Sequence, residues 1–169
     1  MRRSRVFLIV CGALLALLLV APGVSATPPT REPGPPFEGV LKGVCLFPVE
    51  VVTLANREKL LTFYDRAGDV TMQIGTGTLK VRLTNLATGT SLAVNISGPV
   101  RIAPGADGTT TITLGGRSLL YLRAGIDLLP PGITLNAGQQ VITVDAEGRV
   151  TAVTRQTGSA RDLCAELAR

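Results

Sequence analysis

Histidine and tryptophan are both absent from this chain of 169 residues, and aromatic side chains are scarce, with four phenylalanines and two tyrosines. Without histidine, the chain has no Ser-His-Asp triad, no Cys-His pair and no histidine-ligated metal. Acid-base chemistry would fall to carboxylates alone, and we expect neither a cofactor nor a metal site. These absences favour a non-catalytic protein over an enzyme.

Charge is also low once the N-terminus is set aside. The chain has 17 Lys and Arg against 12 Asp and Glu, but three of the arginines and none of the acidic residues lie in the first 26 positions. Without that segment the net charge is +2. Nucleic-acid recognition normally needs clustered basic residues and aromatic side chains for base stacking, so we expect no nucleic-acid partner.

Residues 1–26 have the pattern of an export signal. Three arginines precede an uncharged run over residues 6–20, and Val24-Ser25-Ala26 provides a small-x-small cleavage site. We predict cleavage after Ala26 and a secreted, extracellular protein. The run is shorter than the roughly 20 apolar residues that span a bilayer, so we expect no stable membrane span after cleavage. A retained signal anchor and association with the cell envelope are the alternatives.

Cleavage leaves two cysteines, Cys45 and Cys164. An even number of cysteines in an exported chain is most simply a disulfide, and two cysteines allow one intramolecular pairing. This bond would join the first strand to the C-terminus. The alternative is a free thiol nucleophile, which is disfavoured because no histidine is present to deprotonate it.

The exported chain divides into a short N-terminal segment and one domain. Five of the ten residues from 27 to 36 are proline, and proline neither continues a helix nor donates to a sheet. We therefore expect residues 27–39 to be extended, exposed and partly polyproline II, as a stalk or tail. Residues 40–169 are expected to form a single β domain.

Period-two alternation runs through most of this domain. Leu79, Val81 and Leu83 alternate with polar residues, as do the apolar residues of 92–96, whereas residues 44–54 read as a strand that is apolar on both faces and bent at Pro48. Four short turn signals end in a glycine suited to a positive φ. These signals are residues 66–68, 87–89, 106–108 and 146–148.

The predicted fold class is therefore all-β. We expect an antiparallel sandwich or barrel of about nine or ten strands over residues 40–155. A short C-terminal helix would follow, with Ser159 as its N-cap and Leu163 and Leu167 facing the sheet.

Carboxylates are the remaining candidates for chemistry. A pair of them would allow glycoside hydrolysis, but all except Asp127 flank glycine turns, where acidic residues commonly make local hydrogen bonds. Asp145 and Glu147 also fall far short of the oxygen ligands that calcium needs. The six candidates are Asp65, Asp69, Asp107, Asp127, Asp145 and Glu147.

One strand departs from simple alternation. Arg117, Leu119, Tyr121 and Arg123 fall on one face, and the other face is also largely apolar. Such a strand is either buried on both sides or presents its two apolar residues, framed by arginines, to a partner or an anionic ligand. The apolar loop 128–132 would cap a barrel mouth or extend the same patch.

A resemblance accompanies these patterns. The run 83–91, the segments 95–99, 107–109 and 115–117, and the closing 162–164 together resemble a set of secreted, β-rich actinobacterial proteins that have one early and one C-terminal cysteine. The resemblance implies export, a disulfide and a β fold, and it implies no activity.

The function expected from these observations is a secreted, non-catalytic binding or interaction module. Its partner would be another protein or a small apolar or anionic ligand. A carboxylate-dependent extracellular hydrolase and a structural protein of the cell envelope are the alternatives.

Overall fold

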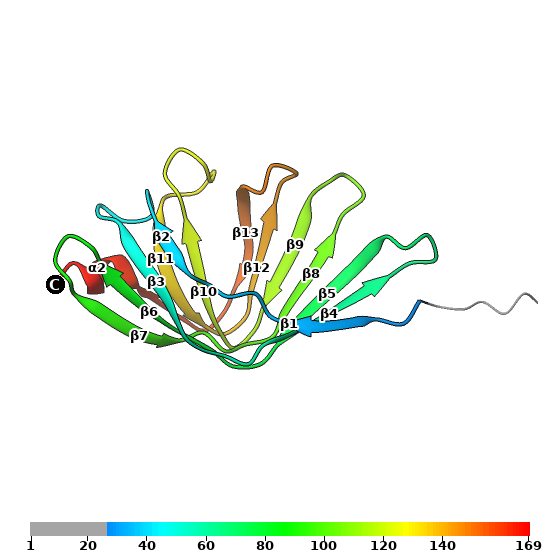
Figure 1. Cartoon of the computed structure of the whole chain (residues 1–169). Coiled ribbons are helices and arrows are strands. Elements are labelled where there is room, and N and C mark those ends of the chain that lie inside the picture. The colour runs from blue at the N-terminus through cyan, green and yellow to red at the C-terminus, as the bar shows by residue number, and fades with distance from the viewer. Residues whose placement is uncertain (1–26) are drawn as a thin grey trace, which may run out of the picture.

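The computed structural model describes residues 27–169, so the expected signal segment lies outside the described residues. Fourteen strands and one short helix make up this part of the chain (Figure 1). All paired strands are antiparallel, which confirms the mostly β class and the short C-terminal helix expected from the sequence. No helix within residues 27–169 is long and apolar enough to cross a membrane.

The strands form three sheets. The seven-stranded sheet has the order β1 (Thr30–Pro33), β4 (Lys59–Tyr64), β5 (Val70–Thr76), β8 (Val100–Pro104), β9 (Thr110–Leu114), β12 (Gln140–Val144) and β13 (Val150–Gln156). The four-stranded sheet has the order β2 (Gly39–Leu41), β3 (Val49–Asn56), β6 (Leu79–Asn85) and β7 (Ser91–Asn95). The three-stranded sheet has the order β10 (Arg117–Leu122), β11 (Gly132–Ala137) and β14 (Ser159–Asp162), and helix α2 (Leu163–Leu167) follows β14.

These strands are the halves of seven long, bent segments. β3 leads into β4 across residues 57–58 and β9 leads into β10 across residues 115–116, so each segment leaves a smaller sheet and enters the seven-stranded one, or the reverse. At most bends, two paired segments remain paired on both sides of the bend. For example, β4 pairs with β5 in the seven-stranded sheet, and their continuations β3 and β6 pair in the four-stranded sheet. β8 pairs with β9, but their continuations β7 and β10 belong to different sheets. The molecule is therefore a bent antiparallel meander that splits in two on one side.

Glycines permit the bends because neighbouring backbones meet there. A Cβ atom at Gly98 would lie well inside contact distance of the Gly115 carbonyl oxygen, and one at Gly158 would clash in the same way with the carbonyl of Ala137. Only glycine tolerates such close approach of two strands.

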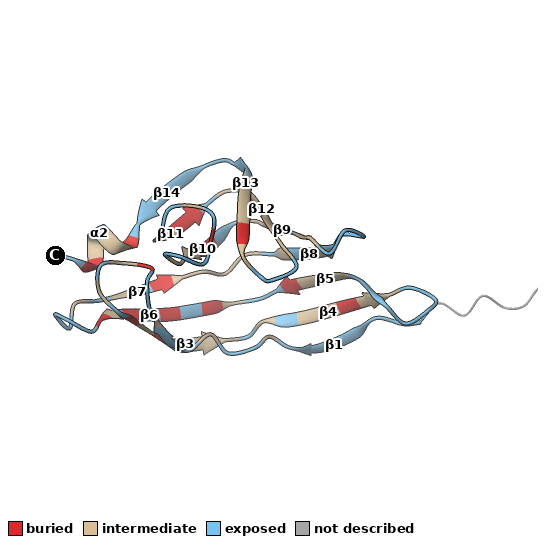
Figure 2. Ribbon diagram, turned by 90° about the horizontal axis from the view of Figure 1, so that it is seen from above, coloured by how far each residue is buried: buried red, intermediate tan, exposed pale blue. Residues whose placement is uncertain are grey.

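The hydrophobic core lies between the two smaller sheets. It combines residues from both sheets with α2 and with the loop before β3, and Figure 2 shows buried residues gathered in β6, β11 and α2. Its buried members are Val44, Val49, Val51, Leu79, Val81, Leu83, Val94, Ile133, Leu135, Leu163 and Leu167. By contrast, the outer part of the seven-stranded sheet, formed by β1, β4, β5 and β8, extends away from this packed region (Figures 1 and 2).

The predicted disulfide is confirmed. Cys45 and Cys164 are bonded, with 5.5 Å between their Cα atoms and a sequence separation of 119. The bond fixes α2 to the loop before β3, and Leu163 and Leu167 are fully buried, as the sequence predicted. The four turn signals are also confirmed, because Gly68, Gly89, Gly108 and Gly148 all have positive φ.

Two parts of the fold prediction are wrong. Residues 27–169 form no closed barrel, and they contain fourteen strands in three sheets rather than nine or ten. The physical reason is the bending: the hydrogen-bonded ladder is interrupted at each bend and changes sheet there, so each long segment contributes two strands.

Three local predictions also need correction. The strand expected from residue 44 begins at Val49, so Cys45 lies in a loop. The residues around Ser159 form β14, and the helix is capped instead by Asp162, whose carboxylate accepts a hydrogen bond from Ala165 N at 3.1 Å. The proline-rich segment is extended and exposed but is no free tail, because β1 pairs with β4 at the sheet edge, where proline is tolerated.

Candidate functional site

Strand β10 is covered on both faces, which is one of the two situations that its sequence allowed. Leu119 and Tyr121 pack against the core, and the Tyr121 ring stacks on Phe37 with 5.9 Å between ring centroids. On the other face, Ser118 and Leu120 are buried. The strand therefore borders both the core and the space inside the bend.

That space contains a cavity of about 240 Å³. It lies where β10 folds back over β9, β12 and β13, and its wall is largely aliphatic. The aliphatic side chains in the wall include Ile112, Leu114, Leu120, Ile142, Val144 and Val150.

Strand register explains why these side chains meet. Ile112 pairs with Ile142 across β9 and β12, and Val144 pairs with Val150 across β12 and β13. Directly paired residues, and residues two positions apart, point to the same face of a sheet. The alternation read from the sequence thus becomes one continuous apolar surface inside the bend.

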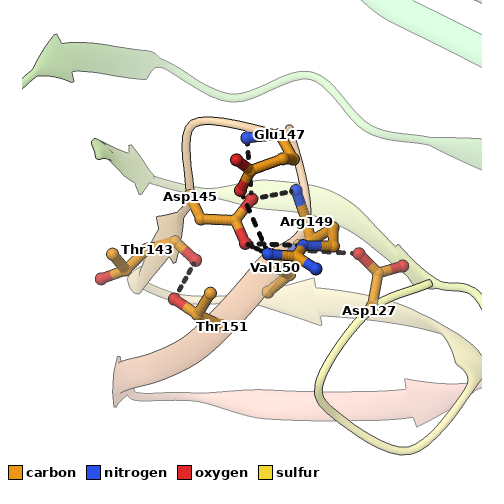
Figure 3. Close-up of polar contacts among 7 residues, drawn as sticks. All are labelled: Asp127, Thr143, Asp145, Glu147, Arg149, Val150 and Thr151. Carbon is orange, nitrogen blue, oxygen red and sulfur yellow. Dashed lines mark hydrogen bonds and ion pairs between the residues drawn. The ribbon is translucent and has the colours of Figure 1, made fainter. Parts of the chain in front are cut away.

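A loop closes one side of the cavity. Asp127, in the loop between β10 and β11, accepts hydrogen bonds from Arg123 N at 2.6 Å and from Val150 N at 2.9 Å. Leu128 N donates to the carbonyl of Val150 at 3.0 Å, so the loop is also held by its backbone. Figure 3 shows Asp127 directed at Val150 at the start of β13.

The charged pair at the cavity is unevenly exposed. Arg123 Nε lies 3.4 Å from Asp127 Oδ2, and the side chains are 36% and 1% exposed respectively. Burial raises the pKa of Asp127, but the hydrogen bonds from Val150 N and Arg123 N, together with the Arg123 guanidinium, outweigh burial and hold its pKa below the ordinary value of 3.8. Asp127 is therefore an ionised carboxylate at neutral pH.

In a neighbouring turn, two carboxylates form ion pairs with an arginine of the same turn. In the hairpin between β12 and β13, Arg149 contacts Asp145 at 2.7 Å and Glu147 at 3.1 Å (Figure 3). The hydrogen bond from the Arg149 backbone, partly opposed by desolvation and supported by its guanidinium, lowers the pKa of Asp145. These two candidate carboxylates are thus occupied by one arginine.

Polar side chains are buried at the bend itself. Asn136 donates to Gln140 at 3.2 Å and accepts from Gln156 at 3.1 Å, which links three strands. Ser118, paired with Asn136 across β10 and β11, is buried and its hydroxyl has no partner within residues 27–169. This amide network fixes the angle between the two halves of the sheet.

A second hollow of about 280 Å³ lies beside the disulfide. Its wall includes Cys45, Cys164 and Asp162, and Leu46 at its edge is fully exposed to solvent. Two loops meet there, because Ala124 N donates to the carbonyl of Gly43 at 2.7 Å.

The structure brings together three of the four residues expected to form a recognition face. Leu119, Tyr121 and Arg123 all contribute to the cavity wall, whereas Arg117 is exposed and does not. Sequence reasoning did not select Asp127 as a site residue, although it was the one candidate carboxylate away from the glycine turns. That exception is the signal by which it could have been found.

Known proteins offer no guide to this site. Comparison of the chain with protein families, with curated proteins and with solved structures finds no match. Among the described residues, no group of three or more cysteine or acidic side chains is placed to hold a metal ion.

Proposed function

We propose that this protein is an exported, non-catalytic binding domain, and that the cavity inside the bend receives an apolar group of its ligand. The observation that carries the proposal is the wall of the cavity, which gathers aliphatic side chains from four strands around an unfilled volume. Removing aliphatic surface from water is favourable, and the wall of this cavity is such a surface. An unfilled aliphatic space therefore suits an apolar occupant.

The size of the cavity limits that occupant. At about 240 Å³ it is smaller than the 300–1,000 Å³ typical of sites that enclose a whole drug-sized ligand. It suits an alkyl chain or one apolar side chain, and each methylene buried there would contribute about 0.8 kcal/mol.

Export is supported by the disulfide. Such bonds persist in oxidising compartments and are rare in the cytosol, so the Cys45–Cys164 bond indicates a location outside the cytoplasm. Together with the signal pattern of residues 1–26, this supports secretion.

The non-catalytic part of the proposal is supported by the state of the carboxylates. A glycoside hydrolase needs an acid whose pKa is raised near a second carboxylate. The pKa of Asp127 at the cavity and that of Asp145 beside it are lowered instead. Burial does raise the pKa of Glu58, but this residue lies at the bend between β3 and β4 and does not line the cavity.

A neutral apolar probe tests this function. We expect 1-octanol to bind the purified domain with one site per chain by titration calorimetry. Val144→Phe fills the cavity and should abolish binding, whereas Val141→Phe, on the opposite face of β12, should leave it unchanged. Absence of binding to the unaltered protein, or equal loss in both variants, would contradict the proposal.

A further inference from the structure

We propose that the ligand is a single-chain amphiphile with a carboxylate head, whose chain lies in the cavity and whose head is bound by the guanidinium of Arg123. This inference rests on the function proposed above and adds the chemical class of the ligand. It commits to a freely dissolved amphiphile, such as a medium-chain fatty acid.

The first ground is that Arg123 retains unused hydrogen-bonding capacity. Its Nε makes a long contact of 3.4 Å with Asp127, and its two terminal nitrogens have no hydrogen-bond partner among residues 27–169. A guanidinium presents its donors as a planar fork that matches a carboxylate. Arg123 also lines the cavity, so a carboxylate bound to it would lie at the cavity mouth.

The second ground is that Asp127 has hydrogen-bond donors besides this guanidinium. Its two oxygens already accept hydrogen bonds from the backbone of Arg123 and Val150, at 2.6 and 2.9 Å. Asp127 is almost fully enclosed, whereas about a third of the Arg123 side chain is exposed. The negative member of the pair thus faces the protein backbone, and the positive member faces the opening.

The third ground is that Arg123 is the one basic residue of 27–169 that lines the cavity. Arg149, in the adjacent hairpin, is engaged by Asp145 and Glu147. An aliphatic wall with one available arginine at its edge fits a ligand that is apolar along its length and anionic at one end.

A head-group series at constant chain length tests the inference. We expect octanoate to bind about tenfold more tightly than 1-octanol, because a hydrogen bond to a charged group is worth more than a neutral one. We expect octylammonium to bind most weakly. Arg123→Gln should remove the preference for octanoate, so that octanoate and 1-octanol bind this variant with similar affinity.

Arg155→Gln provides the matched control. Arg155 is an exposed arginine on β13 that does not line the cavity, so its loss should leave all three affinities unchanged. A chain-length series adds a second readout, because each further methylene from hexanoate to octanoate should tighten binding about fourfold.

The outcomes separate this inference from the proposed function. Equal affinity for octanoate and octanol, or an octanoate preference that survives Arg123→Gln, would overturn the anionic head while leaving the apolar cavity in place. Failure of both probes would overturn the two proposals together. A peptide that ends in Leu-Leu with a free carboxylate and binds more tightly than octanoate would replace the amphiphile with a chain terminus.

Discussion

Asp127 connects the loop at the cavity to the seven-stranded sheet. It lies on a loop of the three-stranded sheet and accepts a hydrogen bond from the first residue of β13 in the seven-stranded sheet. Burying a carboxylate is costly unless its oxygens are hydrogen-bonded, and here both are. The same bonds that satisfy the charge therefore hold the two sheets together at the cavity.

Replacement of Asp127 by asparagine tests this role. One backbone N–H would face an amide nitrogen in place of an oxygen, so we expect Asp127→Asn to lower the free energy of unfolding by about 1–3 kcal/mol. Asp69→Asn, at an exposed turn position, should change it by less than about 0.5 kcal/mol. Urea unfolding at pH 7 measures both.

The pH dependence of unfolding tests whether the ionised form of Asp127 stabilises the fold. Because the pKa of Asp127 is lower in the folded protein than its ordinary value of 3.8, its contribution to stability is present above that value and is lost as the pH falls below it. Urea unfolding repeated at about pH 3 should therefore show a smaller gap between Asp127→Asn and the unaltered protein. A gap that grows on acidification would contradict the assignment.

Tyr121 is a second residue with two competing roles. Its stacking on Phe37 and its contact with the core predict that Tyr121→Ala lowers the free energy of unfolding by roughly 3 kcal/mol, near the lower end of the cost for aromatic truncations in cores. Phe63→Ala, on the uncovered outer part of the seven-stranded sheet, is the comparison and should cost less. An unchanged melting midpoint for Tyr121→Ala would instead favour the recognition face predicted from sequence.

Among the elements, the bends between strand halves distinguish this fold from a barrel. Several bends bring two backbones together at a glycine, as at Gly98 and Gly158, and a side chain added there would clash with the neighbouring backbone. We expect Gly98→Ala to destabilise the fold by about 1–3 kcal/mol or more, because its Cβ would meet the backbone of Gly115 and Arg117.

Gly132 provides a control for Gly98, because it is a glycine without close neighbours. Gly132 begins β11, and a Cβ atom there would have no neighbour within 4 Å. Gly132→Ala should therefore be neutral or slightly stabilising. Thermal unfolding of both variants checks the argument, and equal effects at the two positions would mean that close packing at the bend is unimportant.

The bends also explain what the sequence could predict. Alternating residues such as Leu79, Val81 and Leu83 predict a strand and its buried face, and the glycine turns predict antiparallel neighbours. Alternation alone does not reveal where a long strand leaves one sheet for another, because it indicates which face of a strand is buried and not which strand lies beside it. Strand number and barrel closure were therefore wrong, although the fold class was right.

The candidate site was predictable to a similar extent. The composition of β10 singled out Leu119, Tyr121 and Arg123, because neither face of that strand is polar. The cavity itself depends on β9, β12 and β13 lying beneath β10, which is a matter of long-range topology. Local patterns carry no information about such contacts, and Arg117 was grouped with the others by alternation alone.

At the scale of the whole molecule, the disulfide connects the loop before β3 to the C-terminal helix α2, and both of these pack in the core. It closes a loop of more than a hundred residues, and α2 buries Leu163 and Leu167 beside it. We expect Cys164→Ser to lower the free energy of unfolding by about 2–5 kcal/mol. Reduction of the unaltered protein should produce a similar loss, and two free thiols in the native protein would contradict the bond.

The uncovered part of the seven-stranded sheet makes overall stability sensitive to that bond. Its outer strands carry apolar side chains such as Phe63 and Met72, which pair with each other on one face without a second layer packed on them in the described part of the chain. Most burial is therefore concentrated between the smaller sheets, at the end that the disulfide fixes.

The most direct test of the central claim is a methyl NMR titration of the isoleucine side chains with 1-octanol. Ile112 and Ile142 face the cavity, whereas Ile74 lies on the opposite face of the seven-stranded sheet and Ile133 lies in the closed core. We predict saturable shifts at Ile112 and Ile142, with Ile74 and Ile133 unmoved. Shifts confined to Ile74, or no shift at any of these methyls at the solubility limit of octanol, would contradict a ligand site inside the bend.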